Sequence, residues 1–335
     1  MGRRARLVMC VLGLSGSGCV EIDPAFYEEV SASSGDAGTA TSTGAAGSSG
    51  TASATASGAS SSGPQIPAAF CDDVDDAVVF CTDFEEGHLE QWDDYDGNIV
   101  VENVLTVDPG PRGADDNHVM RLRIPPGAAT VDLVKLLPGF YDRLHMRWYI
   151  QYEPGYDMSM PGLGSGLHAG DRDLLGISDV RPAGDDRFAV LTSHTASDPQ
   201  LLGRLDYRGM YQACADPEKA CSRDELPCLG PGASCANPAH AAFTAVPPLQ
   251  TGQWYCVELM VDAGTPVQTR EAADGVVSLT LDGTQLGLWD DLWFRTDPDL
   301  KLNVAWLLLY FGGEHGDEGV LYDDLVVSRE PVGCW

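Results

Sequence analysis

The chain has almost no lysine, no long apolar run and no sustained helical periodicity. Of its 335 residues, 50 are acidic and 20 are basic, and only three of the basic residues are lysine, so the net charge is −30. Such a charge repels nucleic acid and anionic lipid over a screening length of about 8 Å. We therefore expect no nucleic-acid partner. No stretch of about 18 apolar residues occurs, which excludes a transmembrane helix.

Short runs in which apolar and polar residues alternate are the main pattern present. In Val276–Asp282 the apolar Val277, Leu279 and Leu281 alternate with polar residues, and this period of two predicts a half-buried strand. We expect an all-β fold, an antiparallel β-sandwich or jelly roll with a disulfide-rich loop insertion. Further strands are expected at Ala77–Phe84, Asn98–Val107, Met120–Ile124, Thr130–Leu137, Arg143–Tyr152, Arg187–Thr195, Gln253–Asp262, Leu302–Phe311 and Val320–Ser328.

The N-terminus has the pattern of an export signal. A basic start with three arginines precedes the apolar Leu7–Leu14, and small residues then lead to Cys19. This arrangement resembles a bacterial lipoprotein signal, in which the cysteine is lipidated and becomes the new N-terminus. We therefore expect an exported lipoprotein of the outer membrane or cell surface that contacts the membrane through this lipid alone. The lipoprotein pattern has leucine three residues before the cysteine, where Gly16 stands here, so secretion without a lipid is the alternative.

A low-complexity segment follows the signal. Residues 31–63 contain only serine, alanine, glycine and threonine apart from Asp36, so they cannot bury a core. They predict a flexible tether with a mean span on the order of 30 Å. We expect a signal at 1–19, a tether at 20–64 and one folded domain at 65–335 that contains a cysteine-rich insertion at 212–250. The domain is expected to be a monomer.

Cysteines are numerous for a domain of this size. Besides Cys10 and Cys19 there are eight, and an even number in an exported chain predicts disulfides. Cys71–Cys81 and Cys256–Cys334 are the simplest pairs, although connectivity is not readable from sequence. The other four recur every seven residues in a segment rich in proline and glycine, where we expect two bridges. Zinc is the alternative, but structural zinc sites usually have closer C-x₂₋₄-C pairs. These four are Cys214, Cys221, Cys228 and Cys235.

Several common catalytic and ligand-binding motifs are absent or incomplete. The run Gly162–Gly166 suggests a nucleotide loop, but Leu167 stands where the third glycine belongs and no βαβ pattern surrounds it. Asp94-x-Asp96-x-Asn98 suggests a calcium loop, yet its twelfth position is Leu105 instead of glutamate, which favours a solvated turn.

Longer motifs resemble a known family. Asp83-Phe84-Glu85-Glu86-Gly87, followed by Trp92, resembles the opening strand of concanavalin A-like carbohydrate modules. The C-terminal half is similar to polysaccharide lyase family 14, whose members cleave acidic polysaccharides by β-elimination. The resemblance implies a jelly roll and a polysaccharide or other glycan as partner. The motifs that carry it are Tyr152–Asp157, Pro161–Gly164, Gly252–Tyr255, Leu281–Gly283, Trp293–Arg295, Tyr310–Gly313 and Tyr322–Val327.

The family's catalytic residues do not all carry over. The family has a lysine before Pro-Gly-Leu, where this chain has Met160, and a Ser-x-Arg where it has Ala189 and Leu191. A tyrosine pair spaced by one residue corresponds to Leu205 and Tyr207. One preorganised donor can stabilise a transition state by about 3 kcal/mol or more. Standard β-elimination is therefore not expected, and whether the chain is an enzyme stays open.

One predicted strand offers a surface suited to sugars. In Arg143–Tyr152, the even-numbered Leu144, Met146, Trp148 and Ile150 share one face, which we expect in the core. The opposite face is polar and aromatic, as sugar stacking and hydrogen bonding require. An ordinary solvated face is the alternative. The candidate substrate-binding residues are Arg143, His145, Arg147, Tyr149 and Gln151.

Two histidines and one tyrosine complete the candidate site. His194 and Tyr207 are the candidate bases for a lyase with altered residues, although His194 also fits a structural role. His168, expected in a loop beside the groove, is a candidate for substrate contact or ordinary polar surface. No cofactor is required, but Asp323-Asp324 fits a structural calcium ion or a turn. The sequence thus predicts a protein that binds or cleaves a polysaccharide; a lectin-like or structural surface protein is the alternative.

Overall fold

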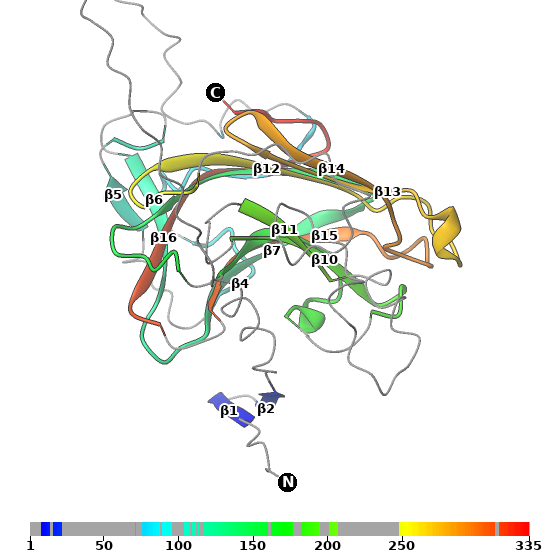
Figure 1. Cartoon of the computed structure of the whole chain (residues 1–335), viewed down its shortest axis with the longest axis horizontal. Helices are drawn as coiled ribbons and strands as arrows, with labels where there is room; N and C mark the ends of the chain where they lie inside the picture. Colours follow the sequence, from blue (N-terminus) through cyan, green and yellow to red (C-terminus); the bar gives the residue numbers. More distant parts are fainter. Residues whose placement is uncertain are drawn as a thin grey trace, which may run out of the picture.

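The protein is a two-layered sandwich of antiparallel sheets (Figure 1). No helix among the described residues is long and apolar enough to span a membrane. The computed structural model describes residues 8–13, 16–21, 71, 76–87, 89–95, 104–107, 109–111, 113, 117–159, 162–176, 182–194, 201–206, 248–311 and 315–334. Every expected strand overlaps an observed one, and the predicted β-sandwich is confirmed.

The larger sheet has the strand order β14-β13-β12-β8-β16-β6-β5, with β3 paired to part of β16. Its central strands β8 and β16 come from distant parts of the chain, so this sheet joins the two halves of the domain. The strands are β3 (Val78–Thr82), β5 (Val104–Val107), β6 (Asn117–Ile124), β8 (Arg143–Tyr152), β12 (Trp254–Asp262), β13 (Gly275–Leu281), β14 (Thr284–Leu292) and β16 (Glu318–Ser328).

The smaller sheet has the order β11-β10-β9-β15-β7-β4. Its strands are β4 (Asp94–Tyr95), β7 (Thr130–Tyr141), β9 (Gly162–Gly170), β10 (Arg187–His194), β11 (Leu201–Asp206) and β15 (Leu302–Phe311). Two short 3₁₀ turns, η3 (Arg172–Leu174) and η7 (Arg270–Ala272), lie in connections. A separate hairpin pairs β1 (Val8–Gly13) with β2 (Gly16–Glu21).

The core lies between the inner faces of the two sheets. Leu144, Met146, Trp148 and Ile150 of β8 all belong to it, as the alternation predicted. From the opposite sheet, side chains such as Leu307 and Phe311 of β15 complete the same cluster. Because full burial of a large aliphatic or aromatic side chain stabilises the fold by about 1.5–3 kcal/mol, this contact is the main stabilising element.

Strand β9 is the main departure from the sequence interpretation. No strand was expected over the glycine-rich run, and His168 was expected in a loop, but the segment forms the middle of the smaller sheet between β10 and β15. The glycines are needed there because a Cβ on Gly166 would lie 2.0 Å from the carbonyl oxygen of Val190. Glycine has a low propensity for strands, but here the close approach of the β9 and β10 backbones requires it.

Both disulfides predicted between described cysteines are present. Cys71 bonds to Cys81 and Cys256 bonds to Cys334, closing sequence separations of 10 and 78 residues. The second bridge fixes the end of the chain to the outer face of the larger sheet. Cys214, Cys221, Cys228 and Cys235 lie outside the described residues, and their pairing stays a prediction.

The two bridges should differ in their effect on stability. In the chain-entropy model, a disulfide stabilises by restricting the unfolded chain, by about 3 kcal/mol for the short loop and about 4–5 kcal/mol for the long one. We expect the double variant Cys256→Ser/Cys334→Ser to lose more unfolding free energy than Cys71→Ser/Cys81→Ser, measured by urea unfolding of each. Equal losses, or a larger loss for the short loop, would contradict this account.

Candidate functional site

The outer face of the smaller sheet carries the positions that the family resemblance implies for catalysis. Strand pairing places Ala189 beside His168, and His168 beside Val304. In the next row, Leu191 and Trp306 lie on either side of Gly166. The expected serine and arginine positions are therefore occupied by small or apolar side chains in the middle of this face.

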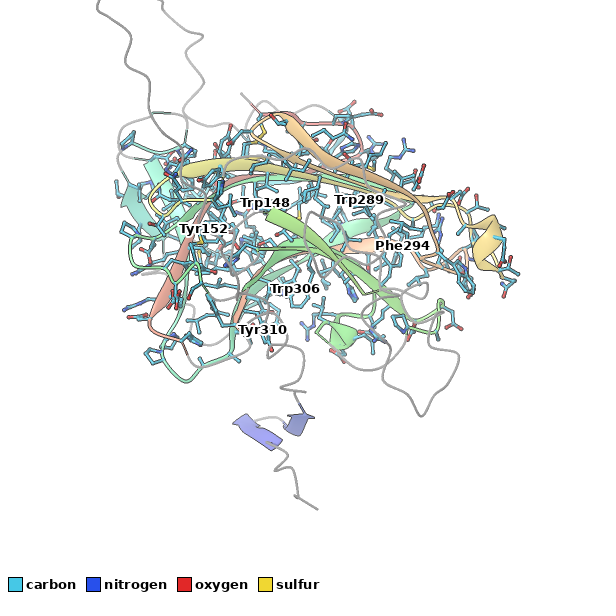
Figure 2. The ribbon with its side chains drawn as sticks, viewed as in Figure 1. Trp148, Tyr152, Trp289, Phe294, Trp306 and Tyr310 are labelled. Atoms are coloured by element: carbon cyan, nitrogen blue, oxygen red, sulfur yellow. A yellow bond between two sulfur atoms is a disulfide. The ribbon has the colours of Figure 1, made fainter. Side chains whose placement is uncertain are left out.

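These residues form a second apolar cluster, separate from the core between the sheets. Leu191 is 9% exposed, and Val304 and Leu308 are buried beside it. The Trp306 indole N–H donates to Asp132 Oδ2 at 2.7 Å. Figure 2 shows Trp306 and Tyr310 on the side of the smaller sheet that faces away from Trp148 and Trp289. The cluster consists of Val134, Leu191, Val304, Trp306 and Leu308, with Leu175 and Tyr310 packed against it.

His168 lies in this outer face, in strand β9 instead of the expected loop. It is 1% exposed, and its Nε2 has no hydrogen-bond partner within the described residues. Burial lowers its pKa to about 4, although a hydrogen bond to the backbone of Asp171 acts in the opposite direction. Nearby Arg187 lowers the pKa further. His168 is therefore a neutral, buried side chain at neutral pH.

His194 points into the core between the sheets. It is 3% exposed, and its ring lies 5.5 Å from the ring of Tyr152 and 5.6 Å from that of Tyr156. Burial raises the pKa of both tyrosines, so they stay protonated. His194 and His168 thus lie on opposite faces of the smaller sheet and do not form one site. Tyr207 and Met160 lie outside the described residues.

The polar face of β8 is on the outside of the larger sheet, away from both histidines. Arg143 forms an ion pair with Asp262, and His145 Nδ1 lies 3.4 Å from Glu258 Oε1. Arg147 is fully buried and stacks over the ring of Tyr149, 5.4 Å from its centroid. Tyr149 is buried as well, and Gln151 is half-buried. Most of this face is therefore engaged inside the protein.

The C-terminal segment accounts for part of this burial. It leaves β16 at Ser328, which is paired with His145, and reaches β12, where Glu258 accepts hydrogen bonds from the backbone N–H groups of Val332 and Gly333. Burial alone would raise the pKa of Glu258, but hydrogen bonds from His145 and these two N–H groups lower it overall. Glu258, which holds this segment, is the strand partner of Arg147.

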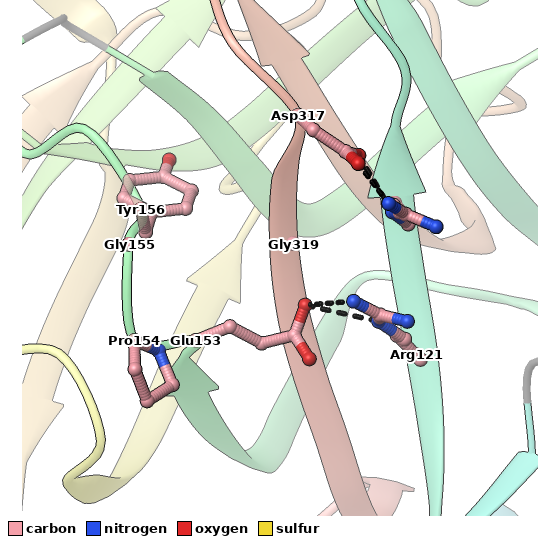
Figure 3. Close-up of a pocket in the computed structure, with 8 residues that line it drawn as sticks. Arg121, Glu153, Pro154, Gly155, Tyr156, Asp317 and Gly319 are labelled. Atoms are coloured by element: carbon pink, nitrogen blue, oxygen red, sulfur yellow. Dashed lines mark hydrogen bonds and ion pairs between the residues drawn. The ribbon is translucent and has the colours of Figure 1, made fainter.

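The same outer face contains a small pocket of about 150 Å³ at the other end of the sheet. Arg121 of β6 donates from Nε and Nη2 to Glu153 Oε2 at 2.9 and 2.7 Å. Arg123 donates from Nε to Asp317 Oδ1 and from Nη2 to Asp317 Oδ2. Figure 3 shows both carboxylates directed toward β6, with Glu153 crossing β16 at Gly319. The lining is Arg121, Arg123, Glu153, Pro154, Gly155, Tyr156, Asp317 and Gly319.

None of the sequence motifs points to this pocket. Arg121 and Arg123 alternate with the buried Met120, Leu122 and Ile124, which identified them only as outward-facing. Glu153 and Asp317 are separated from them by more than 30 and 190 residues respectively, so only the pairing of β16 with β6 and β8 brings them together. A signal that could have pointed to it is the alternation of two arginines on one strand face.

Metal ligands are not grouped in the described part of the chain, where no cluster of three histidine, cysteine or acidic side chains occurs. Asp323 and Asp324 are both buried. Asp323 accepts hydrogen bonds from Asn117 Nδ2 and from the backbone N–H of Asp324, each at 2.7 Å. The Asp323 carboxylate is thus hydrogen-bonded within the protein. A structural calcium ion at Asp323 and Asp324 stays a prediction.

No protein-family model matches the sequence, and no curated protein matches it. Among solved structures, the PL-14 alginate lyase from Aplysia kurodai superposes with a TM-score of 0.51 and 10% identity over 76% of this chain and 99% of that one. Alginate lyase vAL-1 from Chlorella virus gives a TM-score of 0.51 and 13% identity over 76% and 100% of the two chains. The chain therefore has the jelly-roll fold of these polysaccharide lyases.

Because His168 is buried in its neutral form, we expect the folded protein to lose stability as the pH falls. Its folded-state pKa lies below the unfolded value of 6.5, so the unfolded chain binds a proton first as pH falls, and stability is lost between about pH 6.5 and 4. Each unit of pKa difference corresponds to about 1.4 kcal/mol. We expect His168→Asn to lose less unfolding free energy than the wild type between pH 7 and 4.5, measured by urea unfolding. Parallel pH profiles of the two proteins would show that His168 is not buried in its neutral form.

Proposed function

We propose that this chain is an exported, lipid-anchored protein that binds a glycan on a lyase-type jelly roll without cleaving it by β-elimination. The observation that carries the proposal is the apolar outer face of the smaller sheet. There, Ala189 and Leu191 occupy the positions of the Ser-x-Arg pair that the family resemblance implies. The shared fold with alginate lyases supports a carbohydrate as partner.

The chemistry of β-elimination explains why this face is unsuitable. The reaction requires a group that neutralises the uronate carboxylate and a base that removes the neighbouring proton. Leu191 and Trp306 themselves offer a carboxylate neither a charge nor a carboxylate-binding fork in exchange for its hydration, and the nearest cationic residue in the strand pairing is Arg204, opposite Leu191 on β11. His168 is neutral and could act as a base, but Nε2 is buried and has no route to a polymer in this arrangement. Binding is therefore favoured over cleavage.

Overall charge supports a neutral glycan as the ligand. The net charge of −30 repels polyanions such as alginate, and the folded domain contains most of the acidic residues. Neutral sugars are not affected by this field. The predicted lipid on Cys19 and the tether at 20–64 would hold the domain away from the membrane, where it could reach polysaccharides of the cell surface or surroundings.

Binding and cleavage can be separated with the full-length chain. We expect saturable binding to neutral polysaccharides on a glycan array, and no increase in the ultraviolet absorbance of unsaturated sugars during incubation with alginate or glucuronan. An increase that Tyr207→Phe or His194→Ala abolishes would overturn the proposal and show a lyase with a rearranged site. If no glycan binds and none is cleaved, the proposal is wrong, and the alternative of a structural surface protein replaces both the binding and the cleavage hypotheses.

Lipid attachment is tested at the cysteine itself. In a bacterial host, we expect the wild type to incorporate labelled palmitate and to sediment with membranes, because two or more acyl chains bury enough methylene groups for stable anchoring. Cys19→Ser should lose the label and appear in the soluble fraction, whereas Cys10→Ser, within the signal, should retain the label. An unlabelled wild type would show that the chain is secreted without a lipid.

A further inference from the structure

We propose that the pocket between β6 and β16 binds one neutral sugar unit through its two arginine–carboxylate pairs. The inference rests on the proposed glycan-binding function and gives that function a place and a ligand class. It puts the binding site on the outer face of the larger sheet, away from the face on which the family resemblance puts catalysis.

The pocket has room for about one ring. Its volume is about 150 Å³, similar to that of a cavity that holds benzene, and it is partly open to solvent. One pyranose ring can therefore insert in part, while the remainder of a glycan stays in solvent. Pro154 provides an apolar surface beside Glu153, against which the C–H groups of a sugar can pack (Figure 3).

The hydrogen-bonding groups suit vicinal hydroxyls. Arg121 uses Nε and Nη2 for Glu153, and both bonds go to Oε2. Within the described residues, Arg121 Nη1 and Glu153 Oε1 have no partner, and both side chains are partly exposed. A sugar hydroxyl can accept from a guanidinium while its neighbour donates to a carboxylate, so one ion pair can bind a diol.

The pocket is held in shape before any ligand arrives. Glu153 donates its backbone N–H to the Gly319 carbonyl oxygen and accepts from the N–H of Tyr156, each at 3.0 Å. Gly319 leaves space for the carboxylate, because a Cβ there would lie 1.8 Å from Glu153 Oε2. Preorganisation of this kind lowers the entropy that binding costs.

Charge selects a neutral ligand over a uronate. The two arginines are already balanced by Glu153 and Asp317, so the pocket has no net charge. A uronate would bring a third carboxylate close to these two, and like charges at such a distance repel. The ligand class is therefore a neutral hexose, as a terminal or branching unit of a glycan.

The test uses the full-length protein labelled with ¹⁵N-arginine and titrated with the methyl pyranosides of glucose, galactose and mannose, and with methyl glucuronide. We expect the Nε–H signals of Arg121 and Arg123 to shift saturably with at least one neutral hexoside, and methyl glucuronide to bind at least about tenfold more weakly. If no neutral hexoside shifts these signals, or if the glucuronide binds equally well, the proposal is wrong.

Variants identify the groups responsible. Glu153→Gln should weaken binding at least about tenfold, because one carboxylate oxygen becomes an NH₂ donor, the charged pair with Arg121 is lost and the pocket becomes cationic. Asp262→Asn is the matched control, since it removes a carboxylate paired with Arg143 on the same face outside the pocket, and its affinity should be unchanged. If thermal unfolding shows that Glu153→Gln does not fold, Arg121→Lys replaces it, keeping the charge but losing the planar fork, and should weaken binding too.

Failure of this site and failure of the proposed function give different results on the glycan array. If Glu153→Gln and Asp262→Asn both bind the array as well as the wild type, the protein binds glycans elsewhere and only the pocket assignment fails. If the wild type binds no glycan, the proposed function itself is wrong. If Glu153→Gln loses array binding and Asp262→Asn does not, the result supports both the pocket assignment and the proposed glycan-binding function.

Discussion

The contact between the inner faces of the two sheets is the interaction on which the rest of the molecule depends. Trp148 and Tyr322 of the larger sheet and Leu307 and Phe311 of the smaller one are among the buried residues of this core. Because side chains alternate along a strand, fixing one face of each sheet in the core fixes what the other face presents. The chemistry of the outer faces is therefore a consequence of the core.

The two outer faces differ in chemistry. On the smaller sheet, Leu191 and Trp306 belong to an apolar cluster, and the histidine beside it is buried and neutral. On the larger sheet, ion pairs such as Arg121–Glu153 line an open pocket, while Arg147 is buried near the bridged C-terminal segment. The fold is shared with alginate lyases, but the arrangement of polar groups is consistent with recognition of a neutral ligand on a different face.

The sequence predicted the strands better than the positions of the candidate site residues. Alternation in Arg143–Tyr152 assigned its core face correctly, because one face of that strand is uniformly apolar. The same rule failed for the opposite face, where a polar pattern cannot distinguish a solvated side chain from a buried one such as Arg147. Gly162–Gly170 was misjudged because glycine propensity reflects local preference, whereas close strand approach is a tertiary requirement.

The sequence by itself determined the charge, the export signal pattern, the all-β class and the expectation of disulfides. These follow from composition, short-range periodicity and cysteine number, which need no knowledge of distant contacts, whereas the pairings Cys71–Cys81 and Cys256–Cys334 come from the structure. Only the tertiary structure decided that His194 lies inside the core and His168 on the far side of the same sheet. It alone brought Glu153 and Asp317 to the arginines of β6, because residues remote in the chain become neighbours only when their strands pair.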